Sequence, residues 1–231
     1  MHIVNVLTID WDYFFLAPLA MRDEVFPRIT DGKVGAIPDN SLWEDVDKSL
    51  IDDPTYLIDG AKISNLMSTI RTMPRFKGFF LSENHGVMYE LMNQIIKCEG
   101  ESYVDYEITN IDFHHDYYFT NGNTPCCDNW MRLVNEQHDI AAIQWCMRKD
   151  SVTTSFGEHI FDTTPIKIIQ FYDILQRLEL GMYNYIHLCR SDLYSPPVAD
   201  NEFKALAEKL EEKSLASRKF GELEDRSRLM I

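Results

Sequence analysis

The stretch Asn110-Ile111-Asp112-Phe113-His114-His115-Asp116-Tyr117 decides the fold, because it ends an apolar, β-branched segment that starts near position 103. That segment predicts a buried strand over 103–111. In the D-x-H-x-D run an extended chain would send Asp112, His114 and Asp116 to one face, and a strand that frays at its end would still bring them into one small volume. The stretch therefore predicts a cluster of oxygen and nitrogen ligands at the end of one strand.

Two other apolar runs end in the same way. The run over 4–9 predicts a strand that leads into Asp10-Trp11-Asp12, and the run over 76–81 predicts a strand followed by a turn with His85. A helix is expected directly afterwards, over 87–98. In open α/β sheets the functional crevice lies beyond the carboxyl ends of the strands, so three such ends can share one site.

Helices and strands alternate along the chain, which is typical of βαβ units and a parallel sheet. We expect one α/β domain over 1–231, a three-layer α/β/α fold with a mostly parallel central sheet. Asp59 should cap a helix over 60–73, and Asp128 should cap one over 129–136. Further expectations are strands over 140–147 and 183–189, helices over 40–50, 166–178 and 201–218, and loops over 13–38 (with a short helix at 18–24), 117–128 and 148–165.

The predicted ligands are carboxylates and imidazoles: Asp10, Asp12, His85, Asp112, His114 and Asp116. Four Asp and two His fit a pair of Mn²⁺-like ions, because carboxylates can bridge two cations and imidazoles complete their coordination. Buried carboxylates this close to one another would repel each other without a cation. We interpret His115, which points away from its neighbours in an extended chain, as a histidine beside the site or in the core, and His187 as carrying no motif.

The composition of the chain indicates which classes of partner it can bind. The 231 residues carry 22 basic and 37 acidic side chains, a net charge of -15, which argues against nucleic acid and anionic membrane and favours a cationic substrate. The apolar runs are too short to span a bilayer and no secretion signal is evident, so we expect a cytoplasmic protein without a membrane partner. The five cysteines lack a C-x-x-C pair, which favours reduced thiols.

The ligand motifs, which span 9–116, resemble those of the arginase/agmatinase/deacetylase superfamily. In arginases the D-x-D strand follows the D-x-H-x-D strand, whereas here it comes first, as in a circular permutation. That order resembles the peptide arginases of ribosomal peptide biosynthesis. The resemblance implies a hydrolase with two Mn²⁺ ions that converts arginine side chains of a precursor peptide to ornithine and urea. It also implies that Asp10 and Asp112 bridge the ions, with His85 and Asp116 on one ion and His114 and Asp12 on the other.

Two roles are assigned by chemistry alone. The departing amine needs a proton, which His115 or His138 could supply, and Glu83 is a candidate for holding the guanidinium. The general acid and the oligomeric state stay open. One alternative is a ureohydrolase or deacetylase-like enzyme that acts on a small molecule, and another is a metal-stabilised protein that binds a peptide without turnover.

Overall fold

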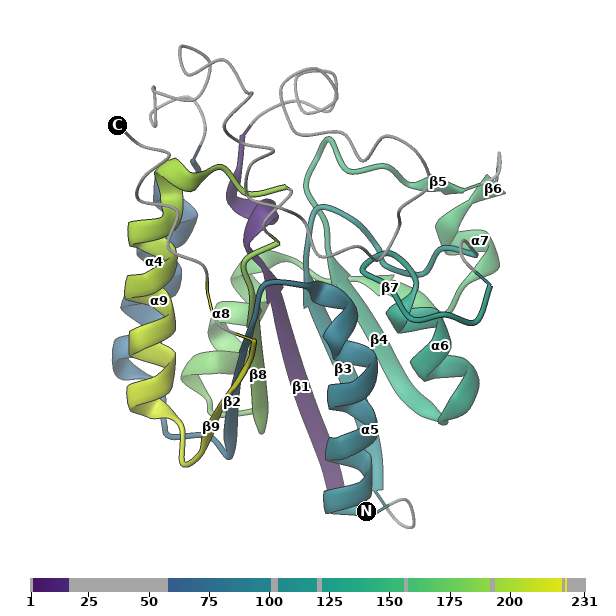
Figure 1. Cartoon of the computed structure of the whole chain (residues 1–231), viewed down its shortest axis with the longest axis horizontal. Helices are drawn as coiled ribbons and strands as arrows, with labels where there is room; N and C mark the ends of the chain where they lie inside the picture. Colours follow the sequence, from purple (N-terminus) through teal and green to yellow (C-terminus); the bar gives the residue numbers. More distant parts are fainter. Residues whose placement is uncertain are drawn as a thin grey trace.

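A computed structural model describes residues 2–16, 58–100, 104–119, 122–155, 158–191, 194–221 and 223. Its centre is a seven-stranded parallel sheet in the order β7-β4-β3-β1-β8-β2-β9 (Figure 1). The strands are β1 (His2–Asp10), β2 (Gly78–Ser82), β3 (Val104–Ile111), β4 (Ile140–Cys146), β7 (Ile166–Ile168), β8 (Tyr185–Cys189) and β9 (Ser217–Phe220). The expected α/β fold with a parallel sheet is confirmed.

Helices cover both faces of the sheet, which gives three layers (Figure 1). One face packs against α4 (Gly60–Thr72), α8 (Phe171–Glu179) and α9 (Asp200–Lys213), and the other against α5 (Met88–Glu99), α6 (Trp130–Gln137) and α7 (Ile160–Thr163). Strand β1 is buried on both sides: Leu7 and Ile9 face the first layer, and Val4 and Val6 face the second. Such a strand needs a continuous apolar run, which is what the sequence provides.

Local signals explain the helix ends. Asp59 caps α4 as expected, since its carboxylate accepts the Lys62 N–H at 3.0 Å. Helix α5 ends at Gly100, whose φ of 97° is a conformation that glycine adopts easily. The cap of α6 is Asn129 rather than Asp128, and Asp128 instead accepts a hydrogen bond from the Cys126 thiol at 2.7 Å.

The order of strands creates a switch point at the centre of the sheet. After β1 the chain passes α4 on one face and continues to β2, whereas after β3 it passes α6 on the other face and continues to β4. Because β1 and β3 are neighbours, the connections that leave their carboxyl ends diverge. A crevice forms where such connections diverge, and the two acidic motifs lie at this position.

Three expected elements were wrong in their bounds. The single helix over 166–178 is a strand, β7, followed by α8, because Ile166 and Ile168 pair with β4 at the sheet edge. The helix over 201–218 ends at Lys213, and the chain then forms β9 beside β2. The loop over 148–165 contains a short hairpin, β5 (Thr154–Ser155) with β6 (Glu158–His159), and α7. The elements expected within 17–57 lie outside the described residues.

Two further findings bear on the sequence-based expectations. All five cysteines are free, as expected of reduced thiols. Among the described residues, the helices are too short or too polar to cross a membrane.

Candidate metal centre

The end of β1 supplies two carboxylates from a turn. The strand continues into a 3-10 turn (Trp11–Phe14), where Asp10 caps the turn by accepting the Asp12 N–H at 3.2 Å. Asp12 lies in the turn rather than in the strand, and its carboxylate accepts the Phe113 N–H at 3.4 Å. Both carboxylates are buried, and the hydrogen bond to Asp12 links the end of β1 to the end of β3.

The end of β3 folds back on itself and holds its acidic groups in place. Asp112 Oδ1 accepts the His114 N–H at 2.7 Å, and Asp112 Oδ2 accepts from Asn110 Nδ2 at 3.2 Å. Asp116 has a φ of 52°, a left-handed conformation that aspartate tolerates better than most residues. The indole N–H of Trp130 donates to its Oδ2 at 2.6 Å, and this bond orients the carboxylate.

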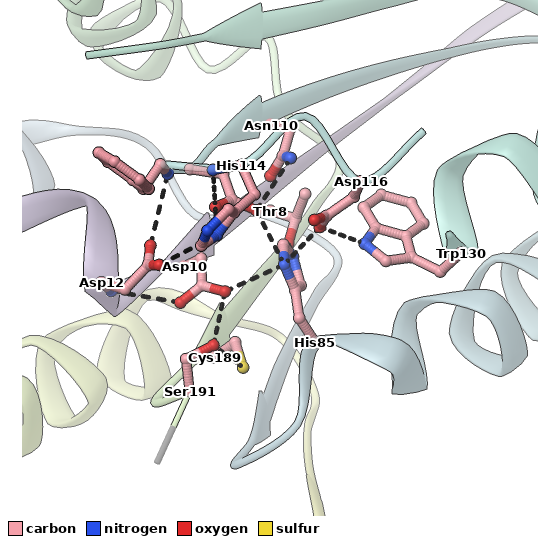
Figure 2. A network of polar contacts seen from close by, with 12 residues as sticks. Thr8, Asp10, Asp12, His85, Asn110, His114, Asp116, Trp130, Cys189 and Ser191 are labelled. Atoms are coloured by element: carbon pink, nitrogen blue, oxygen red, sulfur yellow. Dashed lines mark hydrogen bonds and ion pairs between the residues drawn. The ribbon is translucent and has the colours of Figure 1, made fainter. Parts of the chain in front are cut away.

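His85 brings a third strand end to the same place. It follows β2 in a short 3-10 turn (His85–Val87), which begins where the Asn84 side chain accepts the Gly86 N–H at 2.7 Å. Its side chain is only 1% exposed, and its Nδ1 is surrounded by carboxylates (Figure 2). The distances from Nδ1 are 3.2 Å to Asp10 Oδ2, 3.1 Å to Asp112 Oδ2 and 2.9 Å to Asp116 Oδ2.

These side chains form two groups that could each hold a metal ion. The first is Asp10, His85 and Asp112, and the second is Asp12, Asp112 and His114. Ligand atoms within each group lie within 4.8 Å of one another, and Asp112 belongs to both groups. In the second group His114 Nδ1 is 3.3 Å from Asp12 Oδ2 and 3.9 Å from Asp112 Oδ1. All six predicted ligands are therefore brought together, with Asp116 beside His85.

Burial and mutual repulsion disfavour negative charge in this cluster. Burial raises the pKa of Asp10 and of Asp112, and the neighbouring carboxylates raise both pKa values further. Burial opposes a charge on His85, but Asp116, Asp10 and Asp112 outweigh it and hold the pKa of His85 well above its usual value. Burial likewise opposes a charge on His114, but Asp12 and its neighbours raise the pKa of His114 to about 9.

The donor set fits hard or borderline divalent cations. The buried His85 Nδ1 atom lies within 3.2 Å of an oxygen from each of three carboxylates, so a cation bound between them would be ligated by all four groups. Carboxylates with imidazoles suit Mn²⁺ and its neighbours, whereas thiolates would favour softer metals. Cys127, which borders the cluster, is kept a thiol because burial and the nearby Asp116 raise its pKa.

The three residues assigned by chemistry alone lie apart from these groups. His115 is buried, stacks on Tyr118 with ring centroids 3.8 Å apart and accepts the Tyr117 N–H at 3.0 Å. Burial and the charge on His114 lower the pKa of His115 to about 4, so it is neutral at pH 7 and unsuited to donate a proton there.

His138 and Glu83 make contacts that differ from the roles expected for them. His138 lies just before the amino end of β4, whereas the cluster lies at the carboxyl ends of the strands, and it bonds Asn93 Oδ1 at 2.7 Å, so the structure does not bring it to the cluster. Glu83 forms an ion pair with Arg190, which is fully buried and also lies 3.5 Å from Asp200 Oδ2. Glu83 thus pairs with a guanidinium of the chain itself.

Sequence reasoning missed several polar residues around the ligands. Thr8 and Asp10 lie on one face of β1, and period-two alternation along the strand was the signal that could have paired them. His187 of β8 lies opposite Thr8 and contacts its hydroxyl, but the apolar run around it gave no sign of this contact. Ser191, just after β8, donates its hydroxyl to Asp10 Oδ2 at 2.6 Å (Figure 2).

No family model matches the chain, and no curated protein or solved structure is significantly similar to it. The chemistry of the site must therefore be argued from its geometry.

Proposed function

We propose that this chain is a binuclear manganese hydrolase that converts arginine side chains within a peptide to ornithine and releases urea. The observation that carries the proposal is the pair of Asp/His groups that share Asp112 at the switch point of the sheet. A shared carboxylate between two ligand groups is the arrangement expected of a two-metal site. Asp10, His85 and Asp112 would hold one ion, with Asp116 beside them, and Asp12, Asp112 and His114 would hold the other.

The charge of the site supports a cationic substrate. When bound, two divalent cations supply acidified water as a nucleophile and stabilise the charge that develops in the attacked group. The four carboxylates Asp10, Asp12, Asp112 and Asp116 balance the charge of two such cations, so one additional hydroxide leaves the centre slightly negative. A guanidinium is favoured at such a centre over an anionic substrate.

The shape of the cluster gives a direction of approach. His85 is 1% exposed, whereas the side chain of His114 is 31% exposed and meets the ring of Tyr194 edge-on at 5.5 Å. A substrate would reach the centre from the side of His114. Tyr194 remains a protonated phenol there, because burial raises its pKa, and it could donate a hydrogen bond to a bound group.

Two observations favour arginine in a peptide over the free amino acid. A site that selects the free amino acid must supply hydrogen-bonding partners for its α-amine and α-carboxylate, and arginine is a favoured partner for a carboxylate. Of the arginines that lie near the cluster within the described part of the chain, Arg190 is buried against Glu83, and Arg148 binds Asp150 through two nitrogens. The net charge of -15 would also attract a basic peptide segment.

The test is mass spectrometry on manganese-loaded protein with a panel of arginine peptides. The expected result is the mass loss that marks ornithine, with stoichiometric urea, and negligible turnover of free L-arginine. Asp112→Asn should abolish the reaction, while Asp59→Asn, whose carboxylate caps α4 and belongs to neither ligand group, should retain it. Higher kcat/KM on free arginine than on every peptide would overturn the peptide assignment, and peptide binding without urea would indicate a binding protein.

A further inference from the structure

A layer of polar side chains crosses the sheet directly beneath the carboxylates. Thr8 of β1 lies opposite His187 of β8, and Ser82 ends β2, the next strand. All three are buried, on a face of the sheet whose buried residues nearer the amino ends of the strands are apolar. Buried polar groups are expected to be hydrogen-bonded, so the partners of these three can be followed atom by atom.

The contacts form one continuous chain. Thr8 Oγ1 is 2.7 Å from His85 Nε2 and 2.9 Å from His187 Nδ1. On the far side, His187 Nε2 is 2.8 Å from Ser82 Oγ, and the Ser82 hydroxyl donates to the backbone carbonyl of Asn84 at 3.0 Å. The chain thus runs from the ligand His85 to the backbone of the turn that presents it.

The position of every proton follows from the last link. A carbonyl only accepts and a hydroxyl has one hydrogen, so Ser82 must accept from His187 Nε2–H. A neutral His187 then has a bare Nδ1 that accepts from the Thr8 hydroxyl, and Thr8 in turn accepts from His85 Nε2–H. His187 is fully buried and both of its ring nitrogens face hydroxyl groups rather than carboxylates, which favours the neutral ring.

We propose that Thr8, His187 and Ser82 are positioning residues that hold the proton of His85 on Nε2 and so aim its Nδ1 lone pair at the cation shared with Asp10 and Asp112. This inference rests on the proposed function for the presence of the cation, and it assigns a role to three residues outside the ligand set. Groups that orient a ligating histidine typically contribute 10- to 100-fold to metal affinity. The effect should fall on the ion at His85 and spare the one at His114.

The first experiment is calorimetric titration of the metal-free protein with Mn²⁺. Thr8→Val keeps the shape of the side chain and removes the hydroxyl, and it should weaken the ion at His85 by about 10- to 100-fold. Thr8→Ser, which retains a hydroxyl, should restore the affinity. The matched control is Thr109→Val, because Thr109 is an equally buried threonine in β3 whose hydroxyl bonds Gln144 and Tyr183 on the opposite face.

The second experiment reads the proton positions without any metal. Nitrogen-15 NMR of metal-free protein should show His187 neutral, with its proton on Nε2 and a bare Nδ1. Wild-type affinity in Thr8→Val, or a proton on Nδ1 of His187, would overturn the inference. If the wild-type chain binds no divalent cation, the proposed function fails. The positioning role of Thr8, His187 and Ser82 then fails too, whichever nitrogen of His187 carries the proton.

Discussion

Replacement of Asp112 by asparagine tests the shared ligand. Asparagine keeps the size of the side chain and removes the charge that serves both groups. At metal concentrations about 100 times Kd, each bound ion stabilises the folded chain by about 2.7 kcal/mol, so two ions contribute about 5 kcal/mol. For a chain of this length that corresponds to a rise in Tm of roughly 10–20 °C.

The variant should lose most of this rise. Asp12→Asn, which touches only the group at His114, should lose about half of it, and Asp59→Asn should lose none, because asparagine caps a helix as well as aspartate does. In metal-free protein the difference in stability between wild type and Asp112→Asn should vanish or change sign. Burial and neighbouring carboxylates raise the pKa of Asp112, so its ionised form opposes folding, and metal-free Asp112→Asn should be at least as stable as metal-free wild type.

Thermal unfolding across a Mn²⁺ titration, combined with elemental analysis after gel filtration, measures both effects. Retention of two ions with the full thermal shift in Asp112→Asn would refute the reasoning, since it would show that Asp112 is not the common ligand.

Three other predictions follow from the same contacts. The raised pKa values of His85 and His114 mean that each ion displaces an imidazolium proton when it binds. The affinity for Mn²⁺ should therefore rise about tenfold per pH unit towards pH 9, and calorimetry should detect the released protons. An affinity independent of pH would contradict this. Trp130→Phe removes the N–H that orients Asp116 and should weaken the ion at His85 by roughly tenfold in the same titration. Asp59→Ala should lower the free energy of unfolding in urea by about 1 kcal/mol and leave metal binding unchanged.

The ligand positions were predictable because they depend on local patterns. Long apolar runs fixed β1 and β3, and the polar residues directly after each run had to gather at one edge once the strands were parallel. The geometry within the cluster was not predictable, because Asp12 and Asp116 take their positions from a 3-10 turn and a left-handed residue rather than from strand alternation.

The errors arose where distant contacts decide the structure. Ile166 and Ile168 fit a helical pattern but pair with β4, and residues 217–220 become a strand only because β2 offers a free edge. Glu83 had the right chemistry for a guanidinium, but its partner, Arg190, lies more than 100 positions away. His187 gave no signal because a single histidine in an apolar strand does not show what lies across the sheet.

The unequal exposure of the two imidazoles predicts unequal rates of metal exchange at the two groups. In the proposed two-metal centre the group at His85 is almost fully enclosed, with His85 1% exposed, whereas the side chain of His114 is 31% exposed. An ion at the enclosed position should therefore exchange more slowly with the surroundings than an ion at His114. During its working life the protein would keep one long-lived ion as part of its architecture and renew the other from the metal pool around it.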